Sequence, residues 1–252
     1  MIFKIKEFKR LNNTESSLLL RVYALILSNK LNTMSLTSST IGRKVAMALS
    51  GLFLVVFLTQ HFTINFISVF SEDTFNEISH FMGNNPIVQF LLQPILIFGV
   101  IFHFTMGFVL EIQNRKSRAV QYSVYKGNAN APWASRNMIW SGAVVLSFLG
   151  LHFYDFWFPE MNYKYVEVLP LDSERYFEEM THKFQDLLRV ILYVISFGFL
   201  ALHLFHGFAS SFQSVGFNNK YSPTIKKFTI AFSVVIPLGF IFIALFHHIK
   251  SL

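Results

Sequence analysis

The 252-residue sequence contains no cysteine. Without thiolates the chain cannot form disulfides, hold an iron–sulfur cluster through cysteine or carry a haem attached by thioether bonds, so any redox centre must use other ligands. Charged side chains are also scarce, at 14% of residues, whereas hydrophobic residues make up 53% and the mean hydropathy is +0.45. This composition is too apolar for an ordinary soluble domain and indicates a membrane protein.

The net charge of +7 does not indicate a nucleic-acid-binding protein. A surface for phosphates needs clustered Lys and Arg, and here the basic residues stand between long uncharged runs. We therefore expect no nucleic-acid partner. The composition leaves one feature to explain, which is the presence of nine histidines in a chain this apolar.

Five stretches of the chain lack Asp, Glu, Lys and Arg over a length sufficient to cross a bilayer. A hydrocarbon core of roughly 30 Å needs about 20 helical residues. The sequence therefore predicts an all-α membrane protein with five transmembrane helices. The expected spans are about 45–70, 87–111, 137–158, 187–212 and 227–249, with Asn85 and Pro86 opening the second span and Pro159 closing the third.

Basic residues predict the orientation of these helices. Of the 21 Lys and Arg, 16 fall before the first span, between the second and third, or between the fourth and fifth. The connection between the third and fourth spans, on the opposite side, is mostly acidic. Because cytoplasmic loops are enriched in Lys and Arg, we expect the N-terminus in the cytoplasm and the C-terminus outside.

Residues 1–34 do not fit the five-span pattern. Their apolar stretch, residues 18–27, is interrupted by Arg21, is too short to span and does not form a full signal peptide. Because Met34 begins a segment that leads directly into the first span, we expect either that Met34 is the working start or that residues 1–34 form a poorly ordered leader. Residues 35–252 would then form the five-helix domain.

Four histidines lie within spans, one on each of the first four. They are His61, His103, His152 and His203. His61 follows Lys44 by 17 residues and His152 follows Arg136 by 16. Both therefore lie roughly 25 Å from the cytoplasmic ends of their helices. We call His61 and His152 the outer pair and expect them to share one layer near the outer side.

The other two histidines are on helices that run in the opposite direction. His103 lies 17 residues past Pro86, and His203 lies 14 residues past Arg189. This spacing places both roughly 21–25 Å below the outer surface. We call His103 and His203 the inner pair and expect them to share a second layer.

Two histidines at equal depth on different helices are what a bis-histidine haem requires, because the iron takes one axial nitrogen from each side of the porphyrin. We therefore expect two non-covalent haems, one ligated by each pair. Six-coordinate iron has no open position, so such haems transfer electrons without binding oxygen or substrate. The pattern predicts a four-helix haem-binding bundle, with the fifth helix peripheral to it.

Small residues near the histidines agree with this interpretation. Gly107 and Gly207 each follow an inner-pair histidine by four residues, on the face where a side chain would collide with a porphyrin. Ser50 and Ser141, each followed by glycine, precede the outer-pair histidines by eleven residues and reach the depth of the inner haem. Alternatively, these small residues pack helices together, which is their commoner use in membrane spans.

His206 is the alternative to His203 as the fourth ligand. It lies three residues later, about 60° around the helix, and could meet a haem propionate or a quinone instead. The remaining histidines are interpreted as interfacial or solvated: His80, His182, His247 and His248. A different function for buried histidines is a proton relay in a transporter. Apart from Glu111 at the last position of the second span, the spans carry no acid except Asp155, which also lies near one end, and this weakens that alternative.

Four segments, in order on the first four spans, resemble a known family. They are residues 59–65, 101–107, 148–153 and 202–208. Together with residues 38–44 and 207–216, this ordered set resembles the dihaem cytochrome b subunit, of the b558 type, of succinate dehydrogenases and fumarate reductases from menaquinone-using bacteria. The resemblance covers about residues 35–250.

The resemblance implies a membrane anchor in the bacterial cytoplasmic (inner) membrane. Its partners would be an FAD-containing flavoprotein, which handles succinate and fumarate, and an iron–sulfur subunit, both on the cytoplasmic face. Electrons would pass between these subunits, the two haems and menaquinone in the lipid bilayer. The family pattern, with a ligand four residues before a glycine, favours His203 over His206. The cytochrome b subunit of a hydrogenase or formate dehydrogenase is the alternative.

Overall fold

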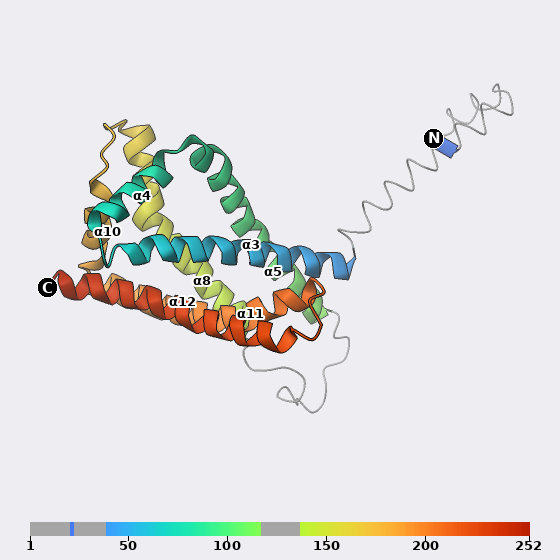
Figure 1. Cartoon of the computed structure of the whole chain (residues 1–252). Coiled ribbons are helices and arrows are strands. Elements are labelled where there is room, and N and C mark those ends of the chain that lie inside the picture. Colours follow the sequence, from blue (N-terminus) through green and yellow to red (C-terminus); the bar gives the residue numbers. More distant parts are fainter. Residues whose placement is uncertain (1–20, 23–38, 117–136) are drawn as a thin grey trace, which may run out of the picture. The chain divides into compact units, whose positions relative to one another are not determined.

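The structure is a computed structural model in which residues 21–22, 39–116 and 137–252 are described (Figure 1). All regular structure in these ranges is helical, so the predicted all-α fold is confirmed. The chain divides into two units, residues 1–46 and 47–252. The helix α3 (Thr40–Ile67) begins in the first unit, and the candidate site lies in the second. The expected boundary between residues 34 and 35 lies outside the described residues.

Five helical segments in the described ranges are long and apolar enough to cross a membrane, as predicted. They are α3, η2 with α5 (Val88–Leu92 and Gln93–Lys116), a third segment that begins with α8 (Met138–His152) and runs to Val166, α11 (Leu187–Ser214) and α12 (Ser222–Lys250). Their bounds differ from the expected ones by a few residues, except at the end of the third span. The second span opens as predicted, because the Asn85 side chain accepts a hydrogen bond from the Ile87 backbone N–H at 2.9 Å.

The prediction that Pro159 ends the third span is wrong. Helical structure continues past it through η3 (Phe153–Trp157), α9 (Phe158–Met161) and η4 (Asn162–Val166). Both η3 and η4 are π-helical, with wider turns than an α-helix. Pro159 lies in the first turn of α9, directly after the π turn. The hydrogen-bond register changes there, so the missing N–H of proline does not end the helix.

Two short helices lie in the connections between predicted spans. They are α4 (Glu72–Asn84) and α10 (Arg175–Phe184), and they pack against each other at one end of the second unit (Figure 1). The buried Asn76 joins them: its amide donates to the Glu174 carbonyl at 3.0 Å, and its oxygen accepts from the Phe177 N–H at 2.8 Å. These bonds satisfy a side chain that would otherwise be costly to bury.

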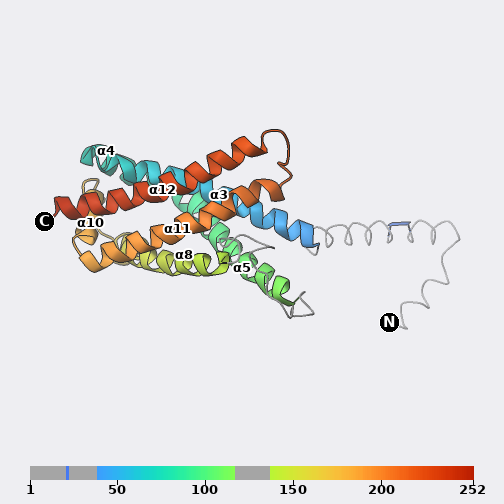
Figure 2. The ribbon, with the colours of Figure 1, turned by 90° about the horizontal axis from the view of Figure 1, so that it is seen from below.

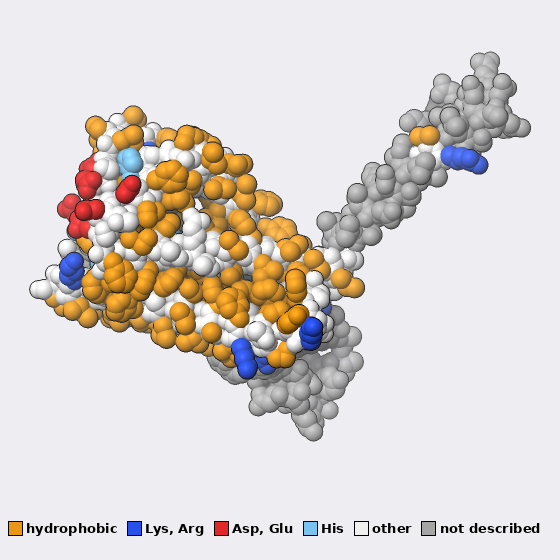
Figure 3. All heavy atoms as spheres, in the orientation of Figure 1, with side chains coloured by type: hydrophobic (Ala, Val, Ile, Leu, Met, Phe, Trp, Pro, Cys, Tyr) orange, Lys and Arg blue, Asp and Glu red, His pale blue; other side chains and the backbone are white. Residues whose placement is uncertain are grey.

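An ion-pair network ties α10 to α9 and η4 at the same end, where Figure 3 shows acidic side chains gathered. Glu160 pairs with Lys164 at 2.5 Å and with Arg175, and Arg175 also contacts Glu179 at 2.7 Å. The Arg175 guanidinium lies 4.0 Å from the centre of the Tyr163 ring. Burial alone would lower the pKa of Arg175, but the hydrogen bonds and charges of the two glutamates outweigh burial and raise it. The guanidinium therefore stays charged.

The apolar core forms where α11 packs along α12 and α8 (Figure 2). Its buried residues from α11 and α12 are Val190, Tyr193, Phe197, Ile236, Phe240, Ile243 and Ala244. The helix α3 reaches this core through side chains, with the Phe62 ring edge-on to Phe240 at 5.2 Å. The fifth span, expected to be peripheral, is the most deeply packed of the five. It packs into the core and also reaches the outer pair, because the Phe240 ring lies 5.9 Å from the His61 ring.

Candidate functional site

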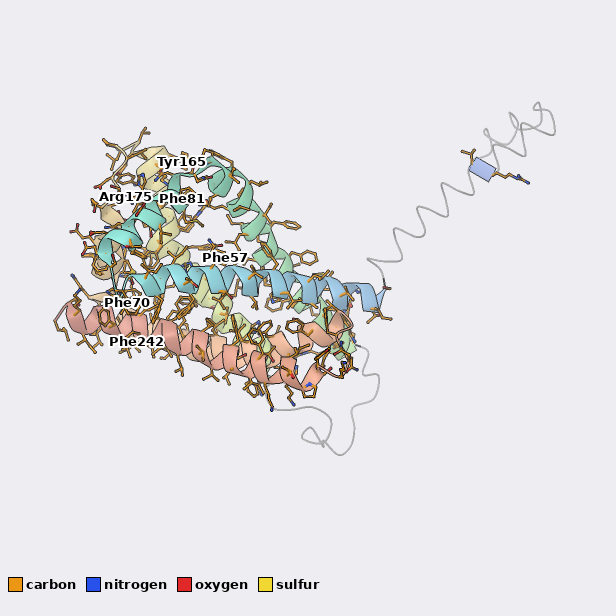
Figure 4. The ribbon with its side chains drawn as sticks, in the orientation of Figure 1. Phe57, Phe70, Phe81, Tyr165, Arg175 and Phe242 are labelled. Atoms are coloured by element: carbon orange, nitrogen blue, oxygen red, sulfur yellow. The ribbon has the colours of Figure 1, made fainter. Side chains whose placement is uncertain are left out.

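His61 and His152, the predicted outer pair, lie in contact. His61 is on α3 and His152 is the last residue of α8. Their ring centroids are 5.6 Å apart and the ring planes are inclined at 84°. Phe57, labelled in Figure 4, stacks on His61 at 5.5 Å, and Phe148 stacks on His152 at 5.8 Å. Each imidazole is thus held by a phenylalanine one turn earlier on its own helix.

His103 and His203, the predicted inner pair, also lie in contact. His103 is on α5 and His203 is on α11. Their ring centroids are 6.3 Å apart, and the planes are inclined at 75°. All four imidazoles are half-buried. The structure therefore brings together the two pairs that equal depth along the helices predicts, and their role as iron ligands stays a prediction.

Ser50 and Ser141 lie against the inner pair. The Ser50 hydroxyl is 3.1 Å from His103 Nδ1, and the Ser141 hydroxyl is 3.4 Å from His203 Nδ1. The glycines that follow these serines allow this close approach. A Cβ on Gly51 would lie 3.3 Å from His103 Cε1, and one on Gly142 would lie 3.4 Å from His203 Cε1.

Gly107 and Gly207 were predicted to leave room for a porphyrin. In the structure a Cβ at Gly107 would lie 3.5 Å from the Met47 methyl group, and one at Gly207 would lie 3.1 Å from the Met138 methyl group. Methionine side chains are flexible and can be displaced from such positions. The role of these glycines in haem clearance therefore stays a prediction, and each glycine has an equivalent methionine neighbour.

His206 does not share the position of His203. In the part of the chain that the structure describes, His103 is the one histidine whose ring contacts the His203 ring. His206 is half-buried one turn further along α11. The inner pair in the structure is therefore His103 with His203, the pairing that the glycine spacing favours.

The interpretation of His247 and His248 as interfacial or solvated is wrong, because both are buried. His247 Nε2 lies 2.8 Å from the Ser68 hydroxyl, which itself donates to the Asn65 carbonyl at 2.6 Å. His248 Nδ1 lies 2.8 Å from the Phe184 carbonyl. These partners come from α3, the α3–α4 connection and α10, so packing between distant segments encloses the end of α12. His182 is exposed, as expected.

Asp155 is a polar group whose partners the sequence did not reveal. It lies on η3, three residues after His152, and is 1% exposed. Its Oδ2 accepts a hydrogen bond from the Tyr193 hydroxyl at 2.9 Å and pairs with Arg189 Nε at 3.1 Å, while Oδ1 has no protein partner. A buried carboxylate needs such partners, because burying an unpaired charge is costly.

The ring separations fit two bis-histidine haems. A metal–imidazole bond of about 2 Å on each side, plus the distance from each ligating nitrogen to its ring centre, puts axial ring centroids about 6 Å apart. The observed separations are 5.6 Å and 6.3 Å. Among the described residues there is no group of three or more His, Cys, Asp or Glu that could hold a metal ion. A haem iron needs none, since the porphyrin supplies four of its six ligands.

Comparison of the chain with protein-family models, with curated proteins and with solved structures found no match. The functional argument therefore depends on the histidine pairs and on the residues around them.

Proposed function

We propose that the chain is a dihaem cytochrome b that carries electrons across a membrane. The observation that supports this most is the contact between His61 and His152 and between His103 and His203, on four helices long enough to span. A histidine relay for protons needs polar groups in sequence along a path. It does not need two separate pairs of rings, each at the spacing of two axial ligands.

In this proposal the outer pair holds one haem b and the inner pair holds the other. The haem, when bound, supplies an iron that alternates between the ferrous and ferric states. The four histidines would hold the two haem irons, and with a histidine on each side of the iron no site would remain for oxygen or substrates. Phe57 and Phe148 stack on the outer imidazoles and hold their ring planes. With no cysteine in the chain, the haems are held without covalent bonds.

We further propose that the chain anchors a succinate:menaquinone oxidoreductase (respiratory complex II) in the bacterial cytoplasmic membrane. The resemblance of the four histidine-containing segments supports this assignment. The flavoprotein and iron–sulfur subunits would dock on the cytoplasmic face, where the basic loops are expected, and menaquinone would exchange electrons with the haems in the bilayer. Succinate and fumarate chemistry would belong to the flavoprotein.

The test is haem content in the purified full-length protein. We expect a reduced-minus-oxidised spectrum of b-type haem, with two haems per chain. Replacing His61 or His152 with alanine should remove one haem, and replacing His103 or His203 should remove the other, because each iron loses an axial nitrogen. His182→Ala, on the exposed face of α10, is the matched control and should keep both haems.

Two results would overturn parts of this proposal. If the purified protein is colourless and shows solute-dependent proton flux, the dihaem proposal is wrong and the transporter is supported. Retention of both haems in His203→Ala, with loss of one in His206→Ala, would transfer the fourth ligand to His206. The proteins that co-purify distinguish the anchor from the alternative: a flavoprotein and an iron–sulfur subunit with succinate dehydrogenase activity support it, whereas a hydrogenase or formate dehydrogenase identifies the other complex.

A further inference from the structure

His103 and His203 of the inner pair have matching neighbours, of the same residue types, on two different pairs of helices. The first and third spans share seven residues at positions 91 apart, five of which are Met47 and Met138, Ser50 and Ser141, Gly51 and Gly142, Phe57 and Phe148, and His61 and His152. The second and fourth spans each carry a histidine followed four residues later by glycine. In both copies the methionine contacts that glycine, and the serine contacts that histidine. The serine contact is therefore a repeated feature.

The hydroxyl proton of each serine is already committed to the backbone. Ser50 Oγ donates to the Met47 carbonyl at 2.8 Å, and Ser141 Oγ donates to the Met138 carbonyl at 2.9 Å. A hydroxyl has one proton to donate, so toward the imidazole each serine oxygen can only accept. For His103 the contact is then a hydrogen bond from Nδ1–H to the Ser50 oxygen. For His203 the Ser141 oxygen shares the imidazole N–H with the Met138 carbonyl, which also accepts from His203. In both imidazoles Nε2 keeps its lone pair free to bind a metal.

We propose that Ser50 and Ser141 are positioning residues for the inner haem. Each accepts the Nδ1–H of His103 or His203, fixes that imidazole as the Nε2-binding tautomer, and holds its ring plane. An acceptor on the far nitrogen makes an imidazole a more basic ligand. A more basic ligand stabilises ferric iron, so the two serines lower the reduction potential of the inner haem. This proposal rests on the proposed function, because it requires haem at the inner pair.

The outer pair lacks this arrangement and serves as an internal reference. His152 Nδ1 is buried and has no protein partner. Among the residues that the structure describes, the ring nitrogens of His61 have only the Asn65 amide nitrogen within hydrogen-bonding distance, at 3.4 and 3.5 Å, and an amide NH₂ is a donor. Neither outer imidazole therefore has an acceptor for its Nδ1–H, and removing the serines should change the inner haem alone.

The experiment is a redox titration of the purified protein with both haems bound, followed by the haem absorbance. The inner and outer waves are assigned from His61→Ala and His103→Ala, each of which leaves one haem. We expect Ser50→Ala and Ser141→Ala each to move the inner wave to a more positive potential, with a larger shift in the double variant. The outer wave should not move. Ser147→Ala is the control, because its hydroxyl also donates to a backbone carbonyl on α8 but faces no histidine.

The direction of the shift decides between two roles. If the serines instead donate to a haem propionate, their loss leaves a negative charge less compensated, and the inner potential falls. A negative shift, an unmoved inner wave or an equal shift of both waves overturns the proposal while leaving the dihaem assignment intact. An alanine variant could lose the inner haem altogether. In that case Ser50→Thr and Ser141→Thr, which keep the hydroxyl, must retain the inner haem at the parent potential. Loss of the inner haem in the threonine variants as well overturns the proposal. A parent protein without haem instead overturns the proposed function.

Discussion

At the scale of single residues, Asp155 shows how a membrane span carries a buried acid. Its carboxylate is held by Tyr193 and Arg189, both on α11, while the carboxylate itself belongs to the π-helical turn η3. The π turn has one extra residue per hydrogen-bonded ring and changes the direction of the side chains that follow it. The pairing therefore joins the middle of the third span to the beginning of α11, next to His152.

Replacing Asp155 with asparagine should destabilise the protein. The change leaves Arg189 without its counter-charge, and breaking a buried ion pair costs about 3–5 kcal/mol. We expect a value near the lower end, because the Arg189 side chain is 23% exposed. Thermal unfolding of the detergent-solubilised protein measures the effect, with Glu77→Gln on the exposed face of α4 as the charge-matched control. A midpoint equal to that of the parent would show that the pair gives no net stability.

At the scale of elements, glycines decide where helices approach one another. A Cβ at Gly239, in the middle of α12, would overlap the ring of Phe62 on α3. By contrast, a Cβ at Gly198 on α11 would have no heavy atom within 4 Å. Small residues that permit close contact are a common way to pack membrane helices, so Gly239 has a steric role that Gly198 does not share.

We therefore expect Gly239→Ala to lower the thermal midpoint of the solubilised protein, because Phe62 must leave its place against Phe240. Gly198→Ala is the matched control and should leave the midpoint unchanged or raise it slightly, since alanine favours a helix by up to about 1 kcal/mol over glycine. Equal midpoints for the two variants would contradict a steric role for Gly239.

The two short helices show why part of the fold could not be predicted. The α4 segment contains its own start signal, because Ser71 accepts a hydrogen bond from the Thr74 N–H and two acids follow it. That signal was present in the sequence. The stability of α4 against α10 depends instead on Asn76, whose partners lie about 100 positions away along the chain. No local pattern reports such a contact.

For the whole molecule, the uninterrupted apolar stretches were enough to predict the five spans, because helix length and bilayer thickness set the same limit. Counting residues along each helix also predicted which histidines meet, since depth changes by a constant rise per residue. It could not predict the burial of His247, whose partner Ser68 lies 179 positions earlier. Nor could it predict how deeply α12 packs, because hydropathy does not separate a lipid-facing span from a protein-facing one: the second span is nearly as apolar as α12 and is the least buried of the five.

The angle between the rings in each pair has a spectroscopic consequence. The rings are inclined at 84° in the outer pair and at 75° in the inner pair. Two iron d orbitals, dxz and dyz, overlap with the π systems of axial imidazoles. When the two imidazole planes are perpendicular, each orbital interacts with one ring to about the same extent, so the two orbitals stay close in energy. We therefore expect each oxidised haem to give a highly anisotropic low-spin electron paramagnetic resonance signal with one dominant low-field feature. A rhombic three-line signal would instead mean that the rings turn parallel when they bind iron.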